Sequence, residues 1–540
     1  MNGCQSKKFA TAIAALLAVM AVVAIVPSSS AAYRHWYGTA GGNFDDPTLW
    51  TEGFLPTNTS DIGEVWYTQS NPITLINDLT TKTLYFYNFK GEFALGDKTL
   101  TANEGGIGGS SYSATVRITD GTFIWNKFVH KKGKLVVDGP TAVHGGYGEL
   151  GVRSGSNADG FNVRMEIVNG ATYRGGVQIG RSGSGSNNVF RVSGAGSRFE
   201  VPSGHPRELV IGSCGGRSNC LEVVDGAVFE NLSTQPLYMD YDTGWGGTLN
   251  GQNLLHVSNA AFTNINSTLH VGYNGGHDTA VFEKGSKARI KTVILGYGRK
   301  SSDTRILGDN LLDVSGEGTV LNVESGTITI GNDYSRGNVF SLSDDAKARA
   351  VYVYAGANSN ATTNDIRISS GAELRTHGME VGYKSVGNRL VLENGSFIGT
   401  RSESRPAGES DYMNFGRNVS GDAELVVKGT NSYLYSSYVV MDSLSRIRIE
   451  IPEDGLVGTR PLIEAINAYI GSATVQVNVS EGFHDGGRFT LMKWNAGADA
   501  TAMLNNGRIT LTGHRASLIV SEHQIDVKIP SDRGFVITFR

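Results

Sequence analysis

The stretch Asn188-Val-Phe-Arg-Val-Ser-Gly194 decides the fold, because the chain repeats it. Three close copies are Asn253-Leu-Leu-His-Val-Ser-Asn259, Asn310-Leu-Leu-Asp-Val-Ser-Gly316 and Asn338-Val-Phe-Ser-Leu-Ser-Asp344. In each copy an asparagine precedes alternating apolar and polar residues, and serine and a turn residue end the unit. Alternation with a period of two is typical of a β-strand with one buried face.

Looser copies of this unit begin at Asn219, Asn364 and Asn388, and Asp278 fills the place of the asparagine in another. The starts from 188 to 388 span 200 residues in seven steps, a mean period of about 29 residues, which is within the range of solenoid repeats. An aliphatic residue followed by glycine precedes most starts by six to eight residues. This second landmark occurs as Ile179-Gly180, Ile211-Gly212, Val271-Gly272, Ile330-Gly331 and Val381-Gly382, and as Leu295-Gly296 with a longer gap.

A single unit of this length cannot bury its own apolar face, so consecutive units must stack. We therefore expect an all-β protein, a right-handed parallel β-helix in which each strand pairs with its equivalent one turn away at roughly 4.8 Å. Equivalent asparagines would lie above one another and hydrogen-bond along the stack, which is a structural role rather than a binding role. The alternative folds are a β-propeller, for which units of about 29 residues are short, and a chain of β-sandwiches.

The composition agrees with a repetitive β-protein. Glycine contributes 71 of the 540 residues and proline only 12, which suits many tight turns with positive φ. Charged residues make up 18% of the chain, and the formal net charge is −4. This negative charge disfavours binding to nucleic acid through a strong basic field.

The first 32 residues have the pattern of a secretory signal peptide. Lys7 and Lys8 precede an apolar stretch at residues 9–26, and small residues follow up to Ala32. We expect cleavage after Ala32 and a bacterial protein that is secreted or held at the cell surface. An uncleaved membrane anchor is the alternative, because the apolar stretch is just long enough to span a bilayer.

Cys214 and Cys220 are the cysteines that remain after the signal peptide. They stand six positions apart, and we expect them to form a disulfide bond in an oxidising compartment. Two free thiols are the alternative. We expect neither a metal site nor a cofactor, because two cysteines without nearby histidines do not make up a zinc ligand set.

The segment after the signal peptide differs from the repeats. It carries Trp36-Tyr-Gly38, Gly42-Asn43-Phe44, Leu49-Trp50, Gly53-Phe-Leu-Pro56 and Asp61. This order resembles the opening of bacterial exported β-helical proteins of the autotransporter-passenger and PEP-CTERM type, although Phe44 stands where those proteins often have tryptophan. The resemblance implies an exported surface protein. We expect neither the membrane barrel of autotransporters nor the C-terminal sorting helix of PEP-CTERM proteins in this chain.

Caps are expected at both ends of the coil, because its apolar interior would otherwise contact water. At the N-terminal end Trp36 and Trp50 would form an aromatic cap, and a sugar-stacking platform is the alternative. At the C-terminal end we expect a small β-rich cap domain, in which residues 462–470 are predicted to be helical. The expected organisation is a signal peptide at 1–32, an N-terminal cap segment at 33–65, β-helix repeats at 66–439 and the cap domain at 440–540.

Candidate catalytic residues lie in the longest insertion between repeats. A glycosidase needs two carboxylates about 5–10 Å apart, and Asp240 and Asp242 would share one face of a strand. Tyr238, Tyr241 and Trp245 are their neighbours and are candidates for contact with a glycan. An ordinary polar excursion of the chain is the alternative.

Two hypotheses about function follow. The first is an exported, non-enzymatic β-helical surface, matrix or adhesion protein, because the repeats carry no convergent catalytic set. The alternative is a carbohydrate-active β-helix, which would be a glycan binder, a polysaccharide lyase or a glycosidase, and it rests on analogy of fold. The expected partner is an extracellular glycan or a component of the cell envelope, with no role for nucleic acid and no membrane insertion after signal cleavage. The sequence leaves enzymatic activity open and favours its absence.

Overall fold

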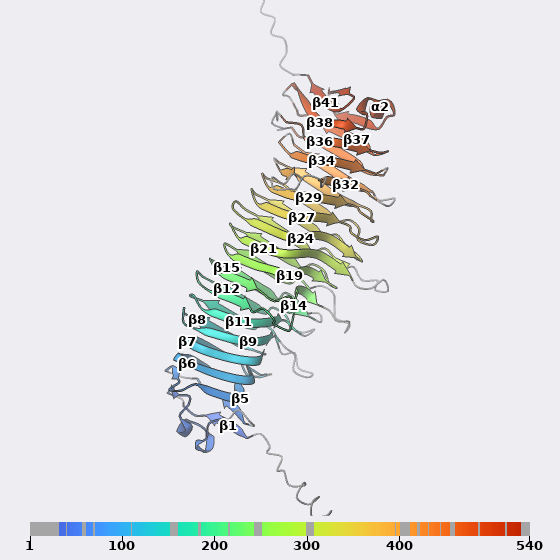
Figure 1. The fold of residues 1–540 in the computed structure, drawn as a ribbon. Helices are drawn as coiled ribbons and strands as arrows, with labels where there is room; N and C mark the ends of the chain where they lie inside the picture. The colour runs from blue at the N-terminus through green and yellow to red at the C-terminus, as the bar shows by residue number, and fades with distance from the viewer. Residues whose placement is uncertain are drawn as a thin grey trace, which may run out of the picture.

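The computed structural model describes residues 32–530 except 39, 57–60, 69–70, 110, 152–159, 182–184, 214–215, 242–250, 299–306, 395, 400–410, 418–421, 430, 443, 454–459, 484–485 and 514–515. The described chain winds into a long rod of stacked coils (Figure 1). Within it, 39 strands join into one sheet, and neighbouring strands pair in parallel except where β41 (Gln524–Ile529) takes part. The predicted all-β parallel β-helix is therefore confirmed.

Each coil has three sides. In one coil these are β12 (Val189–Ser193), β13 (Arg198–Val201) and β14 (Leu209–Ser213). In the next coil β15 (Cys220–Val224), β16 (Val228–Asn231) and β17 (Leu237–Tyr241) pair with them in the same order. We call these sides, in chain order, the first, second and third face.

The first face is one continuous parallel ladder, and the unit that opens with asparagine supplies its strands from β12 to β30. Its further strands are β8 (Gly133–Asp138), β10 (Arg164–Val168), β18 (Leu254–Ser258), β20 (Thr279–Glu283), β23 (Leu311–Ser315), β26 (Val339–Ser343), β28 (Asp365–Ile368), β30 (Asn388–Glu393), β33 (Ala423–Lys428), β35 (Arg446–Ile451), β37 (Thr474–Val479) and β39 (Ile509–Gly513).

In most coils a single strand forms the second and third faces and bends at the corner between them; β6 and β7 include the first face as well. These strands are β5 (Leu79–Phe86), β6 (Lys90–Ile107), β7 (Ala114–His130), β9 (Val143–Leu150), β11 (Thr172–Ile179), β19 (Ala261–Tyr273), β21 (Lys287–Gly298), β24 (Val320–Asp333), β27 (Lys347–Ala355), β29 (Glu373–Val381), β34 (Tyr433–Met441), β36 (Ile463–Ile470) and β38 (Gly487–Gly497). In one coil β31 (Phe397–Gly399) and β32 (Tyr412–Phe415) form the two faces separately.

This corner explains why the predicted helix at residues 462–470 is wrong. The segment is strand β36, which pairs in parallel with β34 and β38. Its inward, buried side chains are Ile463, Ala465, Ala468 and Ile470. The step of three residues from Ala465 to Ala468 marks the corner of the coil, and it imitates helical spacing although the segment is extended on both sides.

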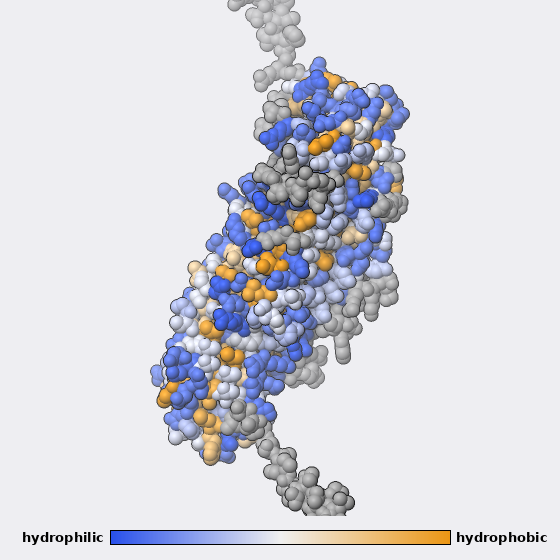
Figure 2. Space-filling model, viewed as in Figure 1, coloured by the Kyte–Doolittle hydropathy of each residue, from blue (hydrophilic) through white to orange (hydrophobic). Residues whose placement is uncertain are grey.

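Apolar side chains fill the interior, and aromatic rings stack from coil to coil. The ring centroids of Phe199 and Phe229 lie 5.0 Å apart, and those of Phe229 and Phe262 lie 4.5 Å apart. Each such contact adds to the area-dependent stabilisation of the core. Outside, hydrophilic residues cover most of the face shown in Figure 2, and hydrophobic ones occur in small groups.

The N-terminal cap consists of three buried aromatic side chains. Trp36 and Phe44 are fully buried and Trp50 is 2% exposed, with ring centroids 4.9 to 5.5 Å apart. The predicted aromatic cap is confirmed, and these rings have no free face on which a sugar could stack. Short elements around them are β1 (Tyr33–Trp36), β2 (Gly42–Asn43), η1 (Pro47–Leu49), η2 (Thr51–Gly53), β3 (Ile62–Val65) and β4 (Ile73–Thr74).

The parallel ladders run past the predicted boundaries of the repeats at both ends. β1 pairs with β3 and β3 with β5, while at the other end the first face continues through β35 and β37 to β39. Beyond these strands, β40 (Ser517–Ser521) and β41 form an antiparallel hairpin against β38, beside the short helix α2 (Ala500–Asn505). A separate pair, β22 (Leu307–Gly308) and β25 (Ser335–Arg336), lies at a turn.

No helix in the part of the chain that the structure describes combines the length and apolar character needed to cross a membrane. Residues 1–31 of the expected signal peptide and the last ten residues of the chain lie outside the described residues.

Candidate functional site

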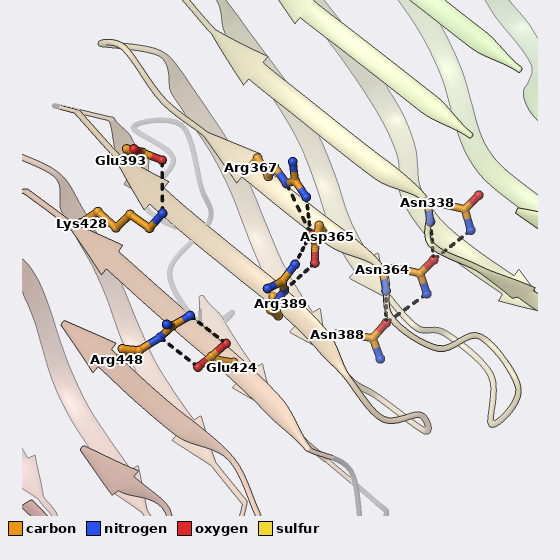
Figure 3. Close-up of polar contacts among 10 residues, drawn as sticks. All are labelled: Asn338, Asn364, Asp365, Arg367, Asn388, Arg389, Glu393, Glu424, Lys428 and Arg448. Carbon is orange, nitrogen blue, oxygen red and sulfur yellow. Dashed lines mark hydrogen bonds and ion pairs between the residues drawn. The ribbon is translucent and has the colours of Figure 1, made fainter. Parts of the chain in front are cut away.

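The repeated asparagines form a buried hydrogen-bonded ladder between the third and first faces. In each regular rung the backbone N–H and the Nδ2 of one asparagine both donate to Oδ1 of the asparagine in the next coil. The Nδ2–Oδ1 distance is 2.9 Å from Asn310 to Asn338. It is 2.8 Å from Asn338 to Asn364 and 3.0 Å from Asn364 to Asn388 (Figure 3). These side chains are at most 1% exposed. The predicted structural role of the asparagines is confirmed.

The glycine landmark makes room for this ladder. At Gly331 the backbone has φ +73°, and a β-carbon there would lie 2.3 Å from Nδ2 of Asn364. Equivalent contacts link Gly212 with Asn253 and Gly272 with Asn310. The glycine therefore lets the chain turn and leaves space for the asparagine one coil later, which explains why the two landmarks keep their order.

One coil departs from this rule at both landmarks. Strand β17 aligns with β14 so that Asp240 stands opposite Gly212, in the glycine position, with φ 58°. The ladder residue that belongs to this place is Asp278 instead of an asparagine. A β-carbon on Gly251 would lie 2.5 Å from Oδ1 of Asp278 and 2.8 Å from Oδ2 of Asp240, so the two carboxyl groups border one point.

Asp278 accepts the hydrogen bonds that an asparagine would accept, but its side chain does not donate one to the next rung. Its Oδ1 accepts from the backbone N–H of Asn253 at 2.8 Å and from Nδ2 of Asn253 at 3.0 Å. Its Oδ2 takes the place of the amide nitrogen and is buried without a hydrogen-bond partner. Burial raises the pKa of Asp278 to about 7, against the lowering effect of the Asn253 hydrogen bonds. A proton on Oδ2 would restore the missing donor toward Asn310.

The structure separates Asp240, one of the two predicted catalytic carboxylates, from any substrate outside the coil. Asp240 is 2% exposed and lies in the turn beside the ladder, where the missing β-carbon of Gly275 makes space for it. Asp242 lies outside the described residues. The sequence could not place Asp240, because the aspartate hides the glycine landmark of that coil.

The predicted glycan-contacting tyrosines lie together on the third face. The ring centroids of Tyr238 and Tyr241 are 4.6 Å apart, and Tyr238 stacks on His270 at 4.8 Å. Tyr273 lies 4.7 Å from Tyr238, and Tyr297 stacks on Tyr273 at 4.9 Å with an interplanar angle of 8°. We call these five residues the tyrosine surface. Trp245, the third predicted aromatic residue, lies outside the described residues.

Burial sets the electrostatic character of the tyrosine surface. It raises the pKa of Tyr238 to about 12, with further contributions from Tyr273 and Tyr241, and it lowers the pKa of His270 to about 4. Tyr238 and His270 are therefore uncharged at neutral pH. A half-buried aromatic surface with these members suits contact with the apolar face of a sugar better than acid–base chemistry.

Sequence reasoning missed Tyr273 and Tyr297, although a signal was present. Each follows a glycine landmark directly, at Gly272 and Gly296. Residues in this position occupy one row along the rod, and Tyr273 pairs directly with Tyr297. Tyr241 follows Asp240 in the same way, so recognition of Asp240 as a substituted landmark would have predicted the row.

The first face carries ion pairs instead of aromatic side chains. Asp365 accepts from Arg367 at 2.8 Å and from Arg389 at 2.7 Å, and Glu424 lies 3.2 Å from Arg448 (Figure 3). Burial tends to raise the pKa of Asp365, but the two arginines lower it below its usual value. The charges on this face therefore neutralise one another.

Cys220 is buried, and its expected partner Cys214 lies outside the described residues, so the predicted disulfide stays a prediction. Burial raises the pKa of the Cys220 thiol to about 12. A thiol with this pKa is a poor nucleophile near neutral pH. Among the described residues, no three histidine, cysteine, aspartate or glutamate side chains come together in a way that could hold a metal ion.

Comparison with known proteins finds one partial match and none of known function. No family model matches the chain, and no solved structure matches it. An uncharacterized protein of Escherichia coli strain K12, YuaQ, is 27% identical over an alignment of 214 residues that covers 34% of this chain and 15% of that protein. The chain thus spans less than two thirds of the length of this relative.

Proposed function

We propose that this protein is an exported, non-enzymatic rod that serves as a surface, matrix or adhesion element. The observation that carries the proposal is the ladder from Asn188 to Asn388, which consists of asparagines except at Asp278 and stabilises an elongated stack of coils. The seclusion of Asp240 in the interior supports the absence of hydrolytic chemistry. The resemblance of the N-terminal segment to exported β-helical proteins supports the location outside the cell.

The partner in this proposal is an extracellular glycan, held by the tyrosine surface. Aromatic rings pack well on the apolar faces of sugars, and Tyr238, Tyr273 and Tyr297 place several rings along the rod axis. A linear glycan would contact consecutive coils, so that weak contacts add up.

A glycan array tests this proposal, with release of reducing ends followed in parallel on the same glycans. We expect binding without release. The double variant Tyr238→Ala/Tyr273→Ala should lose most of the binding, whereas Tyr334→Ala, which changes an exposed tyrosine outside the tyrosine surface, should leave it unchanged. Release of reducing ends by the purified protein would overturn the non-enzymatic assignment, and binding that survives the double variant would overturn the assignment of the surface.

A further inference from the structure

A second group of aromatic side chains lies at the N-terminal end of the third face, around the end of β5 (Figure 1). The ring centroid of Trp66 lies 4.8 Å from that of Tyr87 and 5.0 Å from that of Tyr112. Tyr85 of β5 stacks on Tyr87 at 5.6 Å with an interplanar angle of 24°. Tyr112 is 44% exposed, and the other three side chains are partly exposed. We call these four residues the N-terminal platform.

The backbone and one carboxylate hold the N-terminal platform in place. Gly109 leaves room for two rings, because a β-carbon there would lie 3.3 Å from the ring of Tyr87 and 3.9 Å from that of Tyr112. The N–H groups of Gly109 and Tyr112 each donate to the carbonyl group of the other, at 2.9 and 3.3 Å, and so close the turn that carries Tyr112. Nε1 of Trp66 donates to Oε2 of Glu64 at 3.0 Å. Rings fixed in this way lose little conformational entropy when a ligand binds.

Burial sets the charge state of the N-terminal platform, as it does in the tyrosine surface. Burial, with further contributions from Glu64 and Tyr85, raises the pKa of Tyr87 to about 12. Burial also raises the pKa of Tyr85, and Glu104 raises it further. Both phenols are therefore uncharged at neutral pH, and the indole of Trp66 is only a hydrogen-bond donor. Rings of this kind suit contact with the apolar face of a sugar.

The strand register places the N-terminal platform and the tyrosine surface in line on the third face. The pairings lead from Tyr85 to Tyr238 in six steps, through Gly106, Val129, Glu149, Gln178 and Val210. At roughly 4.8 Å per coil, the two tyrosines lie roughly 29 Å apart along the rod. The five intervening residues of the row are not aromatic. The row therefore carries two aromatic sites with a non-aromatic stretch between them.

We infer that the N-terminal platform and the tyrosine surface bind the same glycan chain, and that this glycan is an extended chain of equatorially linked sugars lying along the rod axis. Equatorial linkages, as in cellulose, give a straight chain whose rise per sugar is close to the spacing of one coil. Such sugars present C–H groups on their flat faces, which pack on aromatic rings. A helical glycan such as amylose would curve away between two sites this far apart.

The second site adds affinity through multivalency. A glycan held by one aromatic site presents its next sugars to the other site at a high effective concentration, because the rod fixes the distance between the sites. The combined affinity can exceed that of either site by about 10²–10⁴. The inference rests on the proposed role of the tyrosine surface in glycan contact, and it adds a second site and the class of the glycan.

The test is binding of the full-length protein to hydroxyethyl cellulose, with cellotetraose and amylose as comparison ligands. Cellotetraose is too short to reach both sites, because its four sugars span only about four coils. We expect hydroxyethyl cellulose to bind at least about a hundredfold more tightly than cellotetraose. Amylose should not show this gain. Biolayer interferometry with the protein immobilised measures all three affinities.

A double variant of the N-terminal platform separates the two sites. Trp66 and Tyr112 both lie outside strands, so that Trp66→Ala/Tyr112→Ala should keep the fold. We expect this variant to bind hydroxyethyl cellulose at least about tenfold more weakly and to keep binding cellotetraose through the tyrosine surface. The control Tyr37→Ala, which changes a tyrosine that is 52% exposed at the same end of the rod, should change neither affinity.

Each other result overturns the inference. Equal affinities for hydroxyethyl cellulose and cellotetraose, an equal gain with amylose, or an unchanged affinity in Trp66→Ala/Tyr112→Ala would show that one chain does not bridge the two sites. No binding of either cellulose-type ligand would overturn the class of glycan. In all these cases, array glycans whose binding is lost in Tyr238→Ala/Tyr273→Ala would leave the proposed function standing, so the two failures are distinguishable.

Discussion

Two stretches of the same ladder differ in the side chain that forms the rung, which is an amide in one and a carboxyl group in the other. From Asn310 to Asn388 every rung is an amide that both accepts and donates, and the facing turns have glycine. At Asp278 the rung accepts twice but lacks a donor, and Asp240 stands in the glycine position. An amide keeps its donor at any pH, whereas a carboxyl group keeps one only while it is protonated. The regular rungs therefore stabilise the rod independently of pH, whereas the Asp278 rung does so only while its carboxyl group is protonated.

Removing a regular rung should have the largest effect. In Asn364→Ala, the N–H and the Nδ2 of Asn338 lose their acceptor inside the coil. We expect the free energy of unfolding to fall by about 4 kcal/mol, because a buried unsatisfied group costs about 1–3 kcal/mol. Chemical denaturation measures this, and Asn431→Ala, at an exposed position, is the control. A loss no larger than that of the control would contradict the role given to the ladder.

Filling the glycine space should have the next largest effect. Gly331→Ala adds a β-carbon 2.3 Å from Asn364 in a turn with positive φ, whereas Gly204→Ala has positive φ but open space around it. The control should cost about 1 kcal/mol for the backbone alone, and Gly331→Ala about 2 kcal/mol more for displacing the rung. Equal melting temperatures for the two variants would refute the coupling of glycine and asparagine.

The Asp278 rung should respond to pH in the opposite sense to the surface carboxylates. Its pKa is raised from 3.8 to about 7 in the folded state, so its stabilising contribution is complete below about pH 4 and is lost as the pH rises through 7. We expect Asp278→Asn to be more stable than the natural protein by about 1–3 kcal/mol at pH 8, and the difference to vanish near pH 4. Denaturation curves at both pH values test this, and a difference independent of pH would disprove the protonated rung.

The smallest effect is expected on the first face. Arg389→Gln removes hydrogen bonds of 2.9 and 2.7 Å to Asp365, but Arg367 still holds that carboxylate. We expect a loss of about 0.5–1 kcal/mol that shrinks at high salt. Because the arginines lower the pKa of Asp365, this loss should disappear as the pH falls below about 4. If Arg389→Gln lowered the free energy of unfolding more than Gly331→Ala, the surface ion pairs would matter more for stability than the interior ladder, which would contradict this ranking.

These regions also show where prediction from sequence succeeds. Eight starts at similar spacing predict the coil, and Asn338 or Asn364 could be assigned to a ladder because only stacking brings such distant residues together. The buried position of Asp240 could not be predicted, because the sequence around it does not show that its backbone has positive φ and takes the place of the landmark glycine. The tyrosine surface was predicted only in part, because Tyr273 and Tyr297 belong to other coils and the landmark that aligns Tyr241 with them is hidden at Asp240.

The closed ends of the rod have a consequence for assembly. A parallel stack of strands offers the same unpaired backbone groups after every coil, so any coil is a template for another chain, as in a growing amyloid fibre. Trp36, Phe44 and Trp50 cover one end, and the antiparallel hairpin of β40 and β41 changes strand direction at the other. An incoming parallel strand would meet an antiparallel neighbour at β41. The caps thus hinder polymerisation at the edges that they cover.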